Sequence, residues 1–117
     1  MNFKPIIKPI LNNLPFLYDT FGLGTGGTDN ARYCYSVWLR HLLKAKENGM
    51  HDLPKTVAEL GPGDSLGVGI AALLSGAEKY YALDAVKYAN AERNKKIYGE
   101  LVKLFAAKAA IPGDDEF

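Results

Sequence analysis

The stretch from Thr56 to Gly67, TVAELGPGDSLG, constrains the fold of this chain more than any other part of it. It begins with residues typical of a short buried strand. The chain then turns through Gly61, Pro62 and Gly63 and continues into an apolar helix predicted over residues 66–74. Glycines let a ligand approach the backbone, and a helix start offers unpaired N–H groups. The stretch therefore predicts a site for an anionic or polar, nucleotide-like ligand.

Glu59 narrows the choice of ligand, because it lies two residues before Gly61. In a dinucleotide-binding fingerprint, the carboxylate that holds the ribose follows the second strand, and the turn accepts a pyrophosphate. A carboxylate at the end of the first strand would repel that pyrophosphate. Glu59 therefore favours a ligand that carries positive charge near the turn.

A second strand is predicted over residues 79–83, and it ends at Asp84. Asp84 follows Gly63 by about 20 residues, the spacing at which a carboxylate can accept hydrogen bonds from the two ribose hydroxyls of a nucleotide. Ala85 and Val86 come next, where the adenine ring would lie. The alternative is that Asp84 only caps a turn.

Two further helices are predicted, over about residues 29–46 with Thr28 or Asp29 as N-cap, and over about residues 90–109. Apolar residues at three- and four-residue spacing give each helix one buried face. These residues are Tyr35, Trp38, Leu39, Leu42 and Leu43 in the first helix, and Ile97, Leu101, Leu104 and Phe105 in the second. The order of elements predicts an α/β fold with a parallel β-α-β unit. Gly67 and Gly69 indicate close approach of the helix over residues 66–74 to a strand.

Residues 1–28 are predicted to form an N-terminal arm and a glycine-rich loop, and residues 29–117 the N-terminal half of a ligand-binding α/β domain. The apolar residues of positions 3–17 fit one helical face, which either packs on the rest of the protein or binds a membrane surface or partner. Residues 18–28 are either a flexible connector or a mobile cover or acceptor-binding loop.

The composition limits the partners of the chain. Its 117 residues carry a formal net charge of +1, which gives no electrostatic reason to expect nucleic acid or an anionic membrane. No apolar run approaches the length of a membrane span. The single cysteine, Cys34, cannot form an internal disulfide, which fits a reducing, cytoplasmic compartment. Cys34 and His41 have no partners at metal-ligand spacing, so no metal site is predicted. Arg32 and Tyr33 are weaker candidates for ligand contact.

From about Gly26 onward the chain resembles the N-terminal part of class I S-adenosylmethionine-dependent methyltransferases. The resemblance rests on the Glu59-x-Gly61-x-Gly63 pattern and on Asp84 after the second strand. It implies a Rossmann-like fold that is incomplete here, with N-terminal helices plus the first β-α-β-α unit. It implies that Glu59 holds the amino end of S-adenosyl-L-methionine, directly or through water, and that Asp84 holds the ribose. The implied cofactor-binding residues are Glu59, Leu60, Gly61, Pro62, Gly63, Asp84, Ala85 and Val86.

The methyl acceptor and any catalytic residue would belong to later strands of such a domain, so the sequence indicates a fragment of a longer enzyme and assigns no catalytic residue. The segments Gly26–Thr28 and Tyr33–His41 resemble bacterial methyltransferases associated with sugar or surface-polysaccharide modification. A small molecule or a glycan is therefore the expected acceptor. Ser65 departs from the family pattern, because it stands where a third glycine is common.

Two alternatives remain open at the level of sequence. The glycine turn and Asp84 also allow an NAD(P)-dependent oxidoreductase, although Glu59 disfavours it. The third candidate is a non-catalytic Rossmann-like domain that keeps the fold for assembly.

Overall fold

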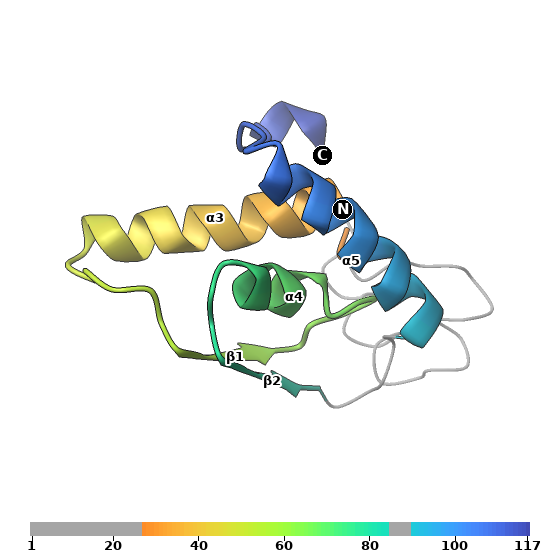
Figure 1. Ribbon diagram of the computed structural model, residues 1–117, viewed down its shortest axis with the longest axis horizontal. Coiled ribbons are helices and arrows are strands. Elements are labelled where there is room, and N and C mark those ends of the chain that lie inside the picture. The colour runs from red at the N-terminus through yellow and green to blue at the C-terminus, as the bar shows by residue number, and fades with distance from the viewer. Residues whose placement is uncertain (1–26, 85–89) are drawn as a thin grey trace, which may run out of the picture.

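The computed structural model describes residues 27–84 and 90–117 (Figure 1). This part of the chain is a small α/β domain. Its elements follow the order α3 (Ala31–Glu47), β1 (Thr56–Leu60), α4 (Gly67–Leu74), β2 (Lys79–Leu83), α5 (Ala91–Ala106) and a short 3₁₀-helix, η1 (Asp114–Glu116). Both strands have the bounds predicted from the sequence, and they pair in parallel from Thr56↔Lys79 to Leu60↔Leu83. The predicted arm and most of the glycine-rich loop lie outside the described residues.

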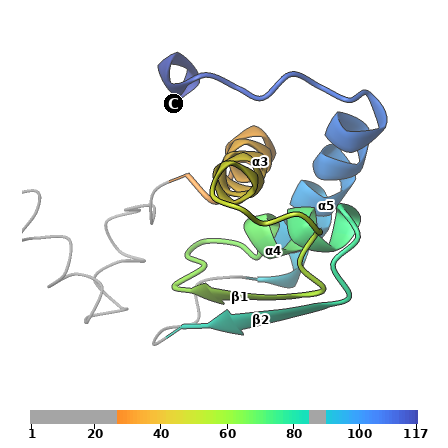
Figure 2. The same ribbon diagram turned by 90° about the vertical axis from the view of Figure 1, so that its left-hand side faces the viewer.

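The described helices lie on one side of the sheet (Figures 1 and 2). Helix α4 packs on both strands, and α3 and α5 pack on α4 and on each other. The opposite face of the sheet, here called the bare face, carries Leu60, Tyr81 and Leu83, each at least half exposed in the described structure. The alternation of side chains along a strand explains why Val57, Glu59 and Tyr80 are partly buried on the helix side.

The core forms where the three helices meet. Tyr35 and Trp38 of α3 pack with Ala71 and Ala72 of α4 and with Ile97 and Leu101 of α5. The Trp38 indole N–H donates a hydrogen bond of 2.8 Å to Ser75 Oγ. The predicted burial of Leu43 is wrong, since this residue is 49% exposed. Helix α3 is about twice as long as α4, so its C-terminal part extends past its neighbour (Figure 1).

The helix ends differ from prediction by one to three residues. Asn30, and not Thr28 or Asp29, is the N-cap of α3, since its side chain accepts from the Tyr33 N–H at 3.2 Å. Helix α5 ends at Ala106, because Lys108 adopts the left-handed conformation with φ +47°.

Residues after α5 run back to α3, where the Ser36 hydroxyl and the Arg40 guanidinium donate hydrogen bonds to the Pro112 carbonyl. No helix among the described residues is long and apolar enough to cross a membrane.

Candidate functional site

The carboxyl ends of β1 and β2 bring the two halves of the predicted site together. The Gly61 N–H donates a hydrogen bond of 2.8 Å to the Leu83 carbonyl, which extends the ladder by one step beyond Leu60↔Leu83. Asp84 therefore follows β2 directly beside the glycine turn, and its side chain is exposed. Ligands of open α/β sheets bind at this edge. Ala85 and Val86 lie outside the described residues.

The turn after β1 needs glycine for its backbone shape. Gly61 and Gly63 have φ values of +68° and +82°, a region that residues with a Cβ rarely adopt. A Cβ built at Gly61 meets no atom of the described residues within 4 Å, so these residues leave the space above Gly61 open. Pro62 is buried, whereas Leu60 is 81% exposed on the bare face. Within the motif, Gly61 and Leu60 are therefore exposed, whereas Glu59 and Gly63 are partly buried.

The N–H groups that follow the turn are already hydrogen bonded within the protein. The Asp64 N–H donates to Thr28 Oγ1 at 2.8 Å, and the Leu66 N–H donates to Asn94 Oδ1 at 3.0 Å. The first helical N–H, that of Gly67, donates to Ser65 Oγ at 3.0 Å. The expectation that this helix start offers unpaired donors to a ligand is thus wrong for these three groups. An anion would have to displace a protein side chain to use them.

Thr28 ties the end of the glycine-rich segment to the turn. The Thr28 hydroxyl oxygen accepts from the Asp64 N–H. The Thr28 carbonyl oxygen accepts from the Ser65 hydroxyl and, at 3.5 Å, from the Cys34 thiol. From the other side, the Arg93 guanidinium donates to the Asp64 carbonyl at 2.8 Å. Sequence reasoning missed these roles of Thr28 and Arg93, because the partners are about 30 residues apart and share no local pattern.

Glu59 is partly buried beneath the turn on the helix side of the sheet. Its Oε2 atom accepts a hydrogen bond of 2.6 Å from the Tyr80 hydroxyl. Burial raises the pKa of Glu59 above its ordinary value, and the charge of Asp84 adds to this, whereas the Tyr80 hydrogen bond and His41 lower it. The carboxyl groups of Glu59 and Asp84 both lie at this edge of the sheet. Tyr80 was not recognised from the sequence, because its contact with Glu59 depends on the register of β1 and β2.

The other candidate side chains serve the fold. Cys34 is fully buried, and burial raises the pKa of its thiol to about 12, which makes it a poor nucleophile. Arg32 pairs with Glu116 at 2.8 Å, and the Tyr33 ring packs edge-on against Phe117. In the part of the chain that the structure describes, no cluster of His, Cys, Asp or Glu could hold a metal ion.

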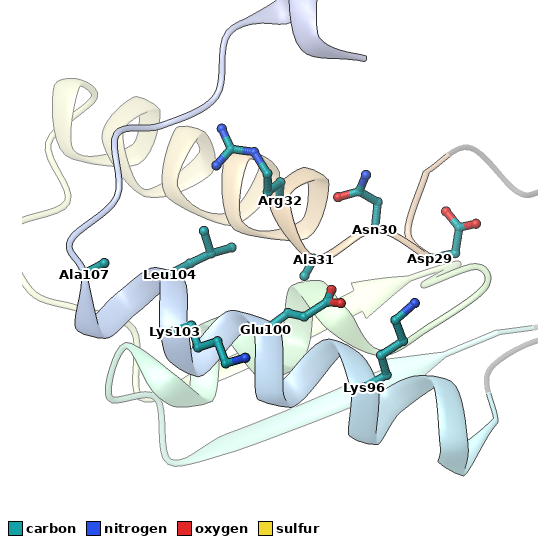
Figure 3. A pocket seen from close by; sticks show the side chains of 9 residues that line it. All are labelled: Asp29, Asn30, Ala31, Arg32, Lys96, Glu100, Lys103, Leu104 and Ala107. Atoms are coloured by element: carbon teal, nitrogen blue, oxygen red, sulfur yellow. The ribbon is translucent and has the colours of Figure 1, made fainter.

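A separate hollow of about 730 Å³ lies between the start of α3 and α5 (Figure 3). Asp29 and Arg32 line it from one side, and Lys96, Glu100 and Lys103 line it from the other. Its charges are mixed, and none of the described residues among those predicted to bind a cofactor lines it. The hollow is therefore distinct from the site at the carboxyl end of the sheet.

Comparisons with protein families, with curated proteins and with solved structures give no match for this chain.

Proposed function

We propose that this chain is the cofactor-binding half of a class I S-adenosylmethionine-dependent methyltransferase, with a Rossmann-like fold. The observation that carries the proposal is the edge of the sheet at which Glu59, the open turn at Gly61 and Asp84 adjoin. A ligand placed across this edge would meet a carboxyl group on each strand and a glycine backbone between them.

The charges at this edge favour S-adenosylmethionine over a dinucleotide. A pyrophosphate would approach Glu59 and Asp84, and three N–H groups beside it are already occupied. S-adenosylmethionine carries an ammonium and a sulfonium group and has no phosphate. Its ammonium group would donate hydrogen bonds to the Glu59 carboxylate, and its two ribose hydroxyls would donate to the Asp84 carboxylate. The NAD(P)-dependent oxidoreductase is therefore the second candidate function.

The chemistry of S-adenosylmethionine is transfer of its sulfonium methyl group to a nucleophile by in-line displacement. The described residues would contribute by orientation: Glu59 and Asp84 fix the two ends of the ligand, and the Gly61 turn leaves room for its middle. We assign no catalytic residue, and a small molecule or a glycan is the proposed acceptor.

The exposed surfaces of the domain fit a sheet that continues. Within the described residues, β1 and β2 pair only with each other, and the bare face carries the apolar side chains Leu60, Tyr81 and Leu83. Further strands and covering helices of a methyltransferase domain would pack against these surfaces.

Calorimetric titration of the 117-residue chain with S-adenosylhomocysteine tests the proposal. We expect saturable binding that S-adenosylmethionine displaces and that NADH does not. Binding of NADH alone would support the oxidoreductase, and binding of neither ligand would support a non-catalytic domain.

Asp84→Ala tests the ribose contact in the same titration. We expect affinity for S-adenosylhomocysteine to fall by at least about tenfold, the loss typical of a hydrogen bond to a charged group. Asp52→Ala is the matched control, because Asp52 is an exposed carboxylate before β1, at the opposite end of the sheet. Equal affinities of the two variants would refute the role of Asp84.

A further inference from the structure

The Tyr80 hydroxyl is the one described side-chain donor to Glu59, and the topology of the sheet brings the pair together. Tyr80 lies opposite Val57 in the parallel register, and Glu59 lies opposite Ala82. The two side chains are therefore diagonal neighbours on the helix side of the sheet, within reach for an aromatic residue. The hydrogen bond fixes Oε2 of Glu59, and among the described residues no side chain donates to Oε1.

Helix α4 determines where the Tyr80 ring lies. Gly69 faces this ring so closely that a Cβ at position 69 would lie 2.1 Å from Tyr80 Cζ. The glycine thus allows the ring to lie between the helix and the sheet with its hydroxyl at Glu59. Since aromatic rings have few rotatable bonds, a ring confined in this way holds its hydroxyl in a defined place.

We propose that Tyr80 is a positioning residue, which orients the Glu59 carboxylate toward the ammonium group of S-adenosylmethionine. This inference rests on the proposed function. Because Tyr80 donates to Glu59, it also stabilises the charged form of the carboxyl group that an ammonium group requires.

The titratable groups around Glu59 predict how the loss of the Tyr80 hydroxyl changes the pH dependence of ligand binding. Tyr80 contacts Glu59 from β2, Asp84 acts on Glu59 from the residue after β2, and His41 acts on Glu59 from α3. Cys34 of α3 acts on Tyr80. Helix α4 contributes no titratable side chain. Loss of the Tyr80 hydrogen bond removes a contribution that lowers the pKa of Glu59. The acidic limb of the binding profile should then move to higher pH.

Tyr80→Phe is the test, with Tyr81→Phe as the matched control on the bare face of the same strand. We would titrate both variants and the wild type with S-adenosylhomocysteine and with 5′-methylthioadenosine, which lacks the amino-acid moiety, from pH 5 to pH 8. We expect Tyr80→Phe to weaken S-adenosylhomocysteine binding by about tenfold. It should shift the acidic limb upward and leave 5′-methylthioadenosine binding unchanged.

The outcomes separate this inference from the proposed function. If the wild type binds neither ligand, the proposed function itself is refuted. If the wild type binds and Tyr80→Phe retains its affinity and pH profile, the positioning role is wrong. Equal weakening of both ligands by Tyr80→Phe would assign Tyr80 a structural role and also refute the inference.

Discussion

Gly69 of α4 and Tyr80 of β2 are packed so closely that an added Cβ at position 69 would lie 2.1 Å from Tyr80 Cζ. A distance of 2.1 Å is far shorter than a van der Waals contact between two carbon atoms. The helix therefore lies close to the strand at this point, as its glycine content predicted. For the second glycine, Gly67, the predicted approach to a strand is wrong, because Gly67 lies against Cys34 of α3.

Gly69→Ala should destabilise the domain by about 1–3 kcal/mol, because the Tyr80 ring must move and lose its hydrogen bond to Glu59. Gly99→Ala is the matched control in α5, where an added Cβ meets no atom within 4 Å. It should stabilise the chain by up to about 1 kcal/mol through helix propensity. Urea denaturation measures both effects. Stabilisation by Gly69→Ala would contradict the close packing.

Glu59→Gln should make unfolding less dependent on pH. Burial raises the pKa of Glu59 in the folded state, so the native protein favours the protonated carboxyl group. The stability that this protonation contributes is fully present below the unfolded pKa of 4.5 and is lost as pH rises through the folded pKa.

The glutamine variant keeps an acceptor for Tyr80 and has no proton to lose. Its free energy of unfolding should therefore rise relative to that of the wild type as pH rises through this window. Above this window we expect the variant to be more stable relative to the wild type than it is at low pH, because the wild type must then keep a partly buried carboxyl group charged. Urea titrations at pH 4 and pH 7 measure the difference. An equal difference at both values would show that the pKa is not raised.

Cys34 should react slowly with thiol reagents in the native protein. Its side chain is fully buried, and a pKa of about 12 leaves about a thousandfold less thiolate than an ordinary cysteine has near pH 8. Reaction with Ellman's reagent should therefore be slow until guanidinium unfolds the chain. Rapid stoichiometric labelling of the folded protein would contradict the packing of Cys34 against Thr28 and Ser65.

Thr28→Val should destabilise the turn, because it removes the Thr28 hydroxyl that accepts from the Asp64 N–H while nearly preserving side-chain shape. The expected loss is about 1–3 kcal/mol. Thr56→Val is the control, since Thr56 is exposed at the start of β1 and should tolerate the change within about 0.5 kcal/mol. Thermal unfolding followed by the fluorescence of Trp38 reports both. Equal melting temperatures would mean that the Thr28 contact contributes no stability.

Several elements could be predicted because their signals are local. The β-branched and aromatic runs at 56–60 and 79–83, each bounded by turn residues or Asp84, fix both strands. The helix periodicity predicts the buried residues Trp38, Ile97 and Leu101, and the glycines predict the turn at Gly61, which the structure shows to be left-handed. The position of Asp84 beside that turn follows once the strands are parallel.

The amino-acid sequence by itself thus determined the order of elements, the glycine turn and the two carboxylates at the edge of the sheet. Only the tertiary structure decided which groups these residues contact. Thr28 binds the turn and leaves the cap of α3 to Asn30, and Asn94 takes the Leu66 N–H. Tyr80 reaches Glu59 because register and Gly69 place its ring there. Such contacts join residues distant in the chain, so they depend on packing that local propensity does not encode.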